Sequence, residues 1–197
     1  MTAIVSKKID AAQCCLHCLE AGNPDDKTVL LLHGMKFNAA TWQDLGSLDV
    51  LASAGYHPVA LDMPGFGESP ACQAEQDQVL SSFISQGELN RPVLVGPSMG
   101  GRIALEFALN HPGILGGLIL VGAVGVEENQ ARLSQLDLPV LLLWGGDDQI
   151  SPLVNSDILL ESVSGAKRVV FAGAPHPCYL DQPDLWHAAV LDFLAAL

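Results

Sequence analysis

Six short runs of consecutive apolar residues recur along this chain, and each is bounded by glycine, proline or aspartate. They occupy residues 28–33, 57–62, 92–96, 117–122, 139–144 and 167–172. None of them alternates apolar with polar residues, as a strand with one solvated face does. Strands that are apolar along their whole length are buried on both faces, which is typical of a parallel sheet covered by helices.

The segments between these runs have the length and the pattern of crossover helices. We expect helices over residues 41–54, 75–86, 99–110, 129–136, 153–162 and 183–196. In the last of these, an apolar residue recurs at every fourth position, which predicts one apolar face made of Leu185, Ala189, Phe193 and Leu197. Strand and helix therefore alternate in the order of a doubly wound sheet.

Two further strands are expected at one edge of the sheet, over residues 2–8 and 14–19, antiparallel to each other. Together these elements predict an α/β fold, with a doubly wound, mostly parallel sheet of about eight strands and helices on both faces. No internal repeat, low-complexity tract or linker interrupts the 197 residues. We therefore expect residues 1–197 to form a single domain.

The charge balance excludes several classes of partner. The net charge is −13, with 9 basic and 22 acidic residues, and such a protein is repelled by nucleic acid and by anionic membrane surfaces. No apolar run reaches the roughly 18 residues of a membrane span. The first eight residues lack the basic-then-apolar pattern of a signal peptide. We expect a cytoplasmic protein with no nucleic-acid or membrane partner.

The five cysteines do not have the pattern of a secreted disulfide framework, because their number is odd and their spacing is uneven. Cys14, Cys15 and Cys18 lie close together, whereas Cys72 and Cys178 stand alone. Reduced cysteines in the cytoplasm fit this pattern better. The segment from Cys15 to Cys18 has no second C-x-x-C or H-x-x-x-H pair that would complete four ligands, so we expect no metal site.

The third apolar run leads directly into a motif with the pattern G-x-S-x-G. It reads Gly96-Pro97-Ser98-Met99-Gly100 and stands between a predicted strand and a predicted helix. This context is that of a nucleophile elbow, in which Gly96 and Gly100 leave room for a tight turn and Ser98 is held out at a helix N-terminus. We expect Ser98 to be a catalytic nucleophile; the alternative is a helix N-cap serine in a glycine-rich turn.

A catalytic serine needs a general base and a carboxylate that orients the base. In elbow folds they follow the serine in the order Asp or Glu, then His. Asp147 and Asp148 come after the run at 139–144, and His176 comes after the run at 167–172. Both positions are at carboxyl ends of predicted strands, which favours His176 as the base, although a surface-loop histidine is the alternative.

An oxyanion hole needs two backbone N–H groups aimed at one point. One is expected from Met99, the residue after the serine. The other is expected from Met35, because Gly34 lets the loop after the first run fold closely. His33, beside this loop, is interpreted as a structural histidine rather than as a base.

The whole chain resembles the α/β-hydrolase fold superfamily and is similar to the small α/β-hydrolase-domain-fourteen proteins, also known as CIB-type proteins. The strings that carry this likeness are LLLHG at 30–34, TWQDLG at 41–46, HPCYLD at 176–181 and WH at 186–187. The fold's pattern G-x-x-D-x-x-x-P fits residues 145–152 and implies Asp148, rather than Asp147, as the acid.

The resemblance implies a small esterase. For mammalian members it implies removal of acyl groups from protein lysines, with coenzyme A as the acceptor. The elbow departs from the serine-richer version of that group toward the general hydrolase consensus, which favours ester hydrolysis. Many α/β-hydrolases insert a helical lid after the strand at 117–122, whereas here only residues 123–138 precede the next strand. We expect a lidless site suited to short acyl chains.

These observations predict a serine hydrolase of small, short-chain acyl esters that needs no cofactor. The first alternative is an acyltransferase or protein lysine deacylase, whose partners are an acylated protein and coenzyme A. Lys36 and Arg102 flank the oxyanion loop and the elbow and could hold such an anionic acceptor, although ordinary solvated charge is the simpler interpretation. The second alternative is a non-catalytic binding module on a hydrolase scaffold, against which the set Ser98, Asp148 and His176 argues.

Overall fold

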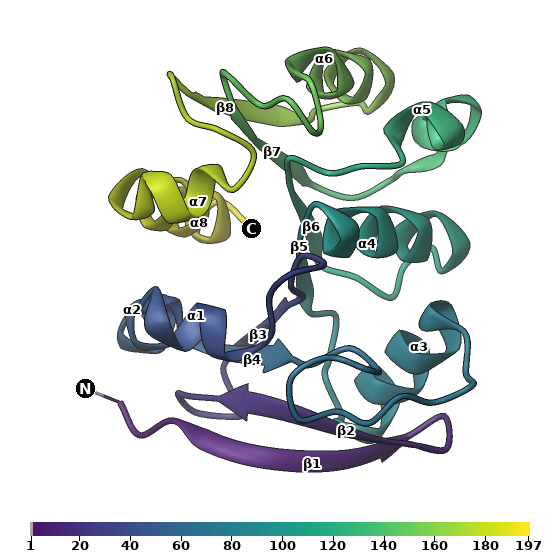
Figure 1. Ribbon diagram of the computed structural model, residues 1–197, viewed down its shortest axis with the longest axis vertical. Coiled ribbons are helices and arrows are strands. Elements are labelled where there is room, and N and C mark those ends of the chain that lie inside the picture. Colours follow the sequence, from purple (N-terminus) through teal and green to yellow (C-terminus); the bar gives the residue numbers. More distant parts are fainter. Residues whose placement is uncertain (1) are drawn as a thin grey trace.

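The computed structural model describes residues 2–197 and contains one eight-stranded sheet of order β1-β2-β4-β3-β5-β6-β7-β8 (Figure 1). Strands β3 to β8 pair in parallel, whereas β2 pairs antiparallel with both β1 and β4. This confirms the predicted doubly wound, mostly parallel sheet. The strands are β1 Val5–Ala11, β2 Cys14–Glu20, β3 Lys27–Leu31, β4 Tyr56–Leu61, β5 Val93–Pro97, β6 Gly117–Val121, β7 Val140–Gly145 and β8 Lys167–Phe171.

Helices cover both faces of the sheet (Figure 1). Helices α1, α2, α7 and α8 lie on one face, and α3, α4, α5 and α6 lie on the other. Their bounds are α1 Ala40–Asp44, α2 Ser47–Ser53, α3 Gln76–Gln86, α4 Met99–Asn110, α5 Val126–Asn129, α6 Leu153–Ser162, α7 Cys178–Asp181 and α8 Pro183–Ala195, with a 3-10 helix η1 at Gln130–Gln135. Each face encloses its own cluster of buried apolar side chains.

The central strands are buried along their whole length, as their unbroken apolar runs predict. Every residue of β5, β6 and β7 is buried. The chain runs from β3 outward to β4 and then returns across the sheet to β5 on the other side of β3. In open α/β sheets, such a reversal leaves a crevice at the carboxyl ends of the strands.

Two expectations are wrong for the face of the sheet that carries α1, α2, α7 and α8. The helix expected over 41–54 is two helices, because the chain breaks at Gly46 with a φ of 79°, a left-handed conformation that favours glycine. The short helix α7 was not expected, because residues 178–181 give too few positions for an apolar period.

The predicted apolar face of α8 is also corrected. Its buried residues include Trp186, Val190 and Leu194, together with the expected Phe193, whereas Leu185 is exposed. The helix is rotated relative to the prediction because Trp186 packs into an aromatic cluster described below. The four-residue period was right, but it does not say which of two adjacent apolar stripes faces the sheet.

The expectation that the cysteines are reduced is wrong for one pair. Cys14 and Cys72 form a disulfide, with Cα atoms 5.8 Å apart, whereas Cys15, Cys18 and Cys178 are free. The two bonded residues are 58 positions apart in sequence, so their approach depends on the tertiary fold. The cysteine pattern therefore no longer supports a reducing compartment.

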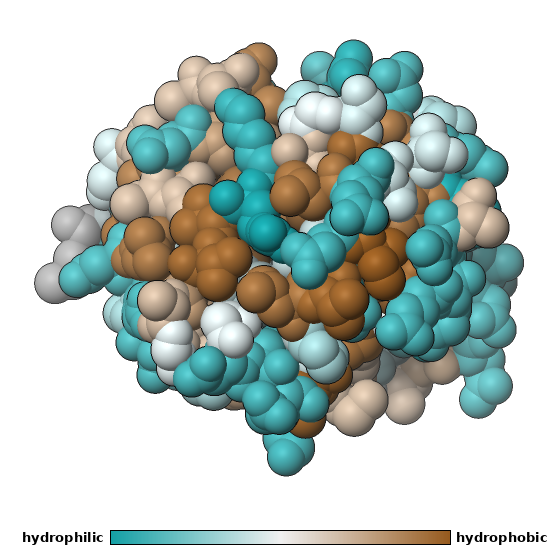
Figure 2. Space-filling model, turned by 90° about the horizontal axis from the view of Figure 1, so that it is seen from above, coloured by the Kyte–Doolittle hydropathy of each residue, from teal (hydrophilic) through white to brown (hydrophobic). Residues whose placement is uncertain are grey.

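Large apolar side chains also remain at the surface. On the face that Figure 2 shows, hydrophobic residues gather in patches between hydrophilic ones. Met35 and Ile150 are the most exposed of the large apolar residues, at 67% and 65%. Within residues 2–197, no helix combines the length and the apolar character needed to cross a membrane.

Candidate active site

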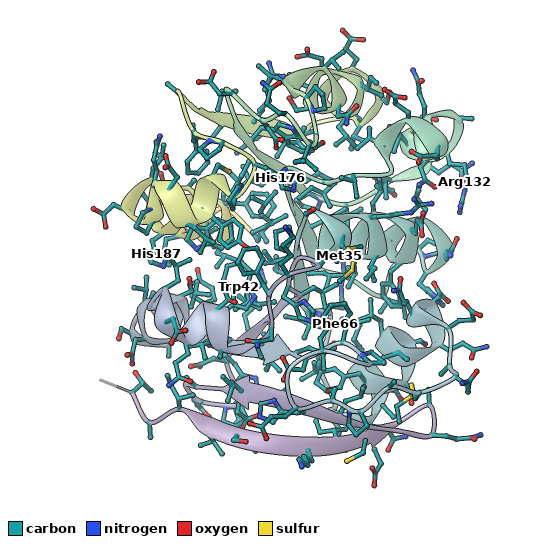
Figure 3. The ribbon with its side chains drawn as sticks, in the orientation of Figure 1. Met35, Trp42, Phe66, Arg132, His176 and His187 are labelled. Carbon is teal, nitrogen blue, oxygen red and sulfur yellow. A yellow bond between two sulfur atoms is a disulfide. The ribbon has the colours of Figure 1, made fainter. Side chains whose placement is uncertain are left out.

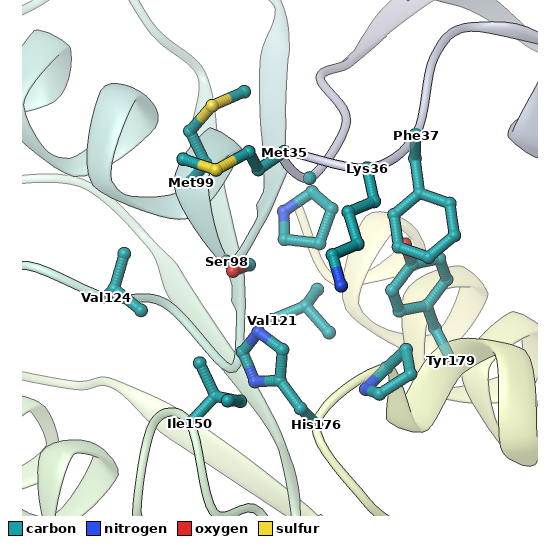
Figure 4. A pocket seen from close by; sticks show the side chains of 13 residues that line it. Met35, Lys36, Phe37, Ser98, Met99, Val121, Val124, Ile150, His176 and Tyr179 are labelled. Atoms are coloured by element: carbon teal, nitrogen blue, oxygen red, sulfur yellow. The ribbon is translucent and has the colours of Figure 1, made fainter.

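The loops that follow five parallel strands meet around one cavity of about 490 Å³ (Figure 4). These loops come after β3, β5, β6, β7 and β8, at the crevice that the sheet topology predicts. Most of the lining is apolar, so the cavity can bind an apolar group such as an acyl chain. The cavity is lined by Gly34, Met35, Lys36, Phe37, Pro97, Ser98, Met99, Val121, Val124, Ile150, His176, Pro177 and Tyr179.

Ser98 stands at the turn between β5 and α4, with its side chain in the cavity (Figure 4). Its φ of 52° and ψ of −113° lie outside the regions that L-residues favour. The backbone is held there by a hydrogen bond from the Ser98 N–H to the Val121 carbonyl, 2.9 Å long, and by the N–H of Arg102, which donates to the Ser98 carbonyl. Strained residues of this kind concentrate at functional sites.

Three glycines make the space for this turn. A Cβ atom at Gly96 would lie 2.2 Å from the Gly100 carbonyl oxygen, and one at Gly100 would lie 2.6 Å from the His33 carbonyl oxygen. Both distances are too short for any larger residue, which supports the expected roles of these glycines. Gly101, which the sequence argument left out, is equally restricted, because its Cβ would meet the Ala123 side chain at 2.6 Å.

His176 and Asp148 form a hydrogen-bonded pair beside the elbow. The Nδ1 atom of His176 lies 2.8 Å from Oδ2 of Asp148. The other oxygen, Oδ1, accepts hydrogen bonds from the N–H groups of Ile150 and Ser151, each 2.8 Å long. Asp148 is buried, whereas its neighbour Asp147 is exposed. The carboxylate that faces the histidine is thus the one that the pattern at 145–152 implies.

The second ring nitrogen of His176, Nε2, is buried and makes no hydrogen bond within the described chain. Figure 4 shows the imidazole below Ser98, with a ring nitrogen turned toward the serine. A neutral imidazole that donates from Nδ1 has a lone pair on Nε2. The ring nitrogen that is free to accept a proton is thereby placed next to the serine hydroxyl.

Gly122 is a further site residue that the sequence argument missed. It follows β6 with a φ of 49°, and a Cβ there would lie 2.9 Å from Asp148 Oδ2 and 3.3 Å from His176 Nδ1. Any side chain at position 122 would therefore crowd the hydrogen bond between Asp148 and His176. The next residue, Ala123, accepts a hydrogen bond from the Ser151 hydroxyl, which ties the Asp148 loop to the end of β6. The sequence feature that could have indicated Gly122 is a glycine directly after a predicted buried strand.

The two amides expected to form an oxyanion hole are both at the cavity. Met99 is the first residue of α4, and Met35 lies in a turn closed by a 3.0 Å hydrogen bond from the Phe37 N–H to the Gly34 carbonyl. Among residues 2–197, no group accepts a hydrogen bond from the N–H of Met35 or Met99. Both donors are therefore available to a ligand, and the N-terminus of α4 adds a positive dipole.

His33 is a structural residue, as expected. Its Nδ1–H donates to the Gly34 carbonyl at 2.9 Å, and its Nε2 accepts from the Met63 N–H at 3.1 Å. Burial lowers the pKa of His33 below the ordinary histidine value, which keeps the ring neutral. His187 lies away from the cavity, on α8, where it faces the Ser47 hydroxyl of α2 (Figure 3).

An aromatic cluster supports the two loops that carry Met35 and His176. Trp42 stacks on Tyr179 at 5.1 Å and on Trp186 at 5.4 Å between ring centroids (Figure 3). The indole N–H of Trp42 donates to the Leu32 carbonyl, next to the oxyanion loop, and that of Trp186 donates to the Ser47 hydroxyl. The four sequence segments that carry the likeness to the family, at 30–34, 41–46, 176–181 and 186–187, therefore lie close together in the fold. Tyr179 also lines the cavity.

The two cations considered for an anionic acceptor have different surroundings. Lys36 lines the cavity and forms no salt bridge within the described residues. Arg102 is bonded at 2.8 Å to Glu106 and lies 3.6 Å from Glu128, and it does not line the cavity. Of the two, only Lys36 remains a candidate for binding an anionic acceptor.

A second Ser–His–Asp series lies at the opposite edge of the sheet. His17 Nδ1 is 2.7 Å from Asp62 Oδ2, and His17 Nε2 is 3.0 Å from the Ser6 hydroxyl. Asp62 also accepts hydrogen bonds from the N–H groups of Ala39 and Glu68, so it ties three segments together. Ser6 lies on the exposed edge strand β1, far in sequence from any helix N-terminus, and lines neither described cavity. This series is a structural network.

Within residues 2–197, no three metal-ligating side chains cluster.

Comparison with known proteins agrees with this fold. The model of the alpha/beta hydrolase fold family matches residues 27–136. The chain belongs to this family, whose members include hydrolases with a nucleophile elbow.

Within the family the chain is similar to the ABHD14 proteins. It is 37% identical over 179 residues to "Putative protein-lysine deacylase ABHD14B" of Rattus norvegicus, covering 86% of this chain and 84% of that one. It is 36% identical to protein ABHD14A of Danio rerio, covering 86% and 64% of the two chains. The crystal structure of a "predicted CIB-like hydrolase" from Thermoplasma acidophilum has the same fold over the full length of both chains, with a TM-score of 0.95 and 24% identity.

Proposed function

We propose that this hydrolase of the α/β-hydrolase family cleaves short-chain acyl esters through an acyl-enzyme on Ser98. In this proposal, His176 is the general base and Asp148 is the carboxylate that orients it. The observation that carries the proposal is the position of His176. One nitrogen is fixed by a buried carboxylate at 2.8 Å, and the other is buried, unpartnered and turned toward Ser98.

The first half-reaction follows from this arrangement. The Ser98 oxygen attacks the ester carbonyl while its proton passes to Nε2 of His176. The carbonyl oxygen becomes an oxyanion, to which the N–H groups of Met35 and Met99 donate hydrogen bonds. The imidazolium is stabilised by Asp148 and then gives its proton to the departing alcohol. This leaves the acyl group on Ser98.

In the second half-reaction, water takes the place of the alcohol. His176 removes a proton from the water, which attacks the acyl-enzyme, and the same two amides hold the second oxyanion. The proton then returns to the serine oxygen as the acid leaves. In each half-reaction His176 takes up one proton and gives it back, and Ser98 is acylated in the first and regenerated in the second, so the steps balance with the ester and water alone.

Acyl transfer to another acceptor is the second candidate function. The name of the ABHD14B relative and the unpaired Lys36 at the cavity favour it. In this case the thiol of coenzyme A would replace water, and the acyl group would come from an acylated lysine of a protein. The same acyl-enzyme on Ser98 would form first.

Turnover of 4-nitrophenyl butyrate, measured with and without coenzyme A, tests both candidates. Ser98→Ala should lower kcat by about three orders of magnitude or more, because loss of a triad member removes the nucleophilic route. Ser6→Ala, in the structural network, is the matched control and should retain full activity. The proposal is wrong if Ser98→Ala retains more than about a tenth of the wild-type kcat. Formation of butyryl-coenzyme A at a higher rate than butyrate would favour the transferase.

A further inference from the structure

We propose that Lys36 makes this cavity a subsite for a carboxylate, so that the enzyme prefers esters that carry a second, negatively charged group. This inference rests on the proposed function and names its substrate class. Lys36 is the only basic residue other than His176 among the residues that line the cavity, and none of them is acidic. A carboxylate on the substrate would supply the opposite charge to the Lys36 ammonium.

Lys36 is one of six basic residues that form no salt bridge within residues 2–197, and it is the only one of the six that lines the cavity. Lys7, Arg102 and Arg168 each form a salt bridge with a carboxylate. Lys36 forms none within residues 2–197, although the chain carries 22 acidic residues against 9 basic ones. In a protein with a net charge of −13, Lys36 thus places a positive charge on the wall of this cavity.

The direction of the side chain supports a role in binding. Lys36 belongs to the turn that carries the Met35 amide, and Figure 4 shows its amine reaching into the cavity beside Phe37 and Tyr179. Neither Phe37 nor Tyr179 carries a negative charge that would compete for the ammonium. Lys36 is itself exposed, so an ion pair with it would form at the solvent-facing rim of the cavity, where salt screens it.

The geometry also fits a bifunctional substrate. The ester carbonyl would lie between Ser98 and the Met35 and Met99 amides, and the carboxylate would lie at Lys36, one residue from Met35. A short dicarboxylic half-ester places these two groups a few carbons apart. A neutral acyl chain of the same length would leave the ammonium unpaired over an apolar surface.

Two pairs of matched esters test the inference and locate the charge. The first pair is the 1-naphthyl half-ester of adipic acid and its methyl-capped diester, which differ in the charge of the acyl side. The second pair is 4-butyryloxybenzoate and its methyl ester, which differ in the charge of the leaving group. The ratio of kcat/KM for the charged over the neutral ester is measured for wild type, Lys36→Met, Lys36→Arg and the surface control Lys8→Met.

In at least one pair, wild type should prefer the charged ester by about fivefold or more, chiefly through a lower KM. Lys36→Met should remove this preference through a loss of kcat/KM on the charged ester, whereas Lys36→Arg and Lys8→Met should keep it. Raising the salt concentration from 0.05 to 0.5 M, values chosen to span about a threefold change in screening length, should weaken the preference in wild type, Lys36→Arg and Lys8→Met, and should leave the ratio of Lys36→Met unchanged.

The pair that shows the preference assigns the carboxylate to the acyl group or to the leaving group. Equal ratios for wild type and Lys36→Met in both pairs would overturn the inference but leave the proposed function intact. If wild type cleaves none of the four esters, the proposed function fails, and the inference fails with it.

Discussion

Ser98 holds a backbone conformation that costs free energy, and its surroundings are built to keep it there. A non-glycine residue in such a region costs about 1–3 kcal/mol. The turn persists because Gly96, Gly100 and Gly101 let β5, α4 and the chain after β6 approach within distances that no Cβ would allow. The result is a hydroxyl at the start of a helix, with an unpartnered histidine nitrogen beside it.

Asp148 and Asp147 provide a direct comparison of two adjacent carboxylates. Asp148→Asn should lower kcat by about 10³–10⁴, because the amide no longer fixes the tautomer of His176 or stabilises its charged form. Asp147→Asn should change kcat by less than about threefold, since Asp147 is exposed and does not contact the histidine. Steady-state kinetics on a butyrate ester measures both, and the reverse ranking would assign the acid to Asp147.

At the scale of elements, the connection between β6 and β7 determines how open the site is. It contains α5 and η1, and its residues Val126 and Leu133 are fully buried in the core on the α4 face. The connection thus packs against the body of the molecule and contributes Val124 alone to the cavity. No segment is left there to form a lid.

A lidless cavity should limit the length of the acyl chain. Each buried CH₂ group contributes about 0.8 kcal/mol, or roughly fourfold in kcat/KM, but only while the chain stays inside the cavity. We expect kcat/KM on a series of 4-nitrophenyl esters to peak between acetyl and butyryl and to fall by octanoyl. A specificity constant that rises through octanoyl and dodecanoyl would show a buried acyl tunnel.

For the whole molecule, buried histidines link stability to pH. Burial is the main cause that lowers the pKa of His33, His57 and His187 in the folded state. Between each lowered pKa and the ordinary value of about 6.5, the unfolded chain binds a proton that the folded chain does not. The free energy of unfolding should therefore fall as the pH falls below about 6.5.

Urea unfolding at pH 7.5 and pH 5.5, values chosen on either side of the ordinary histidine range, checks this expectation. We expect a lower free energy of unfolding at the acidic pH, and a smaller decrease in His57→Gln, which removes one of the buried groups. If residues 1–197 form one domain, as we propose, each curve should show a single transition. An equal or higher stability of wild type at pH 5.5 would contradict the assignment.

Much of this arrangement could be predicted from the sequence because it depends on local patterns. Unbroken apolar runs indicated strands buried on both faces, and the elbow motif placed Ser98 between a strand and a helix. Chain order then led to His176 and to the adjacent pair Asp147 and Asp148. The family pattern at 145–152 implied Asp148, which the structure places 2.8 Å from His176. Their catalytic roles stay predictions.

The remaining features depend on contacts between distant segments, which no local pattern reveals. Gly122 is restricted by Asp148 and His176, and Cys14 bonds to Cys72 across 58 positions. The stripe of α8 that is buried depends on Trp186 stacking against Trp42, about 140 residues earlier in the chain. The left-handed break at Gly46 was hidden because a glycine inside a helical pattern has no unique meaning.

The most direct test of the central claim is covalent labelling with a fluorophosphonate, followed by intact mass measurement and peptide mapping. The account predicts one adduct per chain in wild type, located on Ser98. The same adduct should form in Ser6→Ala and be absent from Ser98→Ala. No adduct in wild type, or an undiminished rate of labelling in Ser98→Ala, would contradict the assignment of Ser98 as the nucleophile.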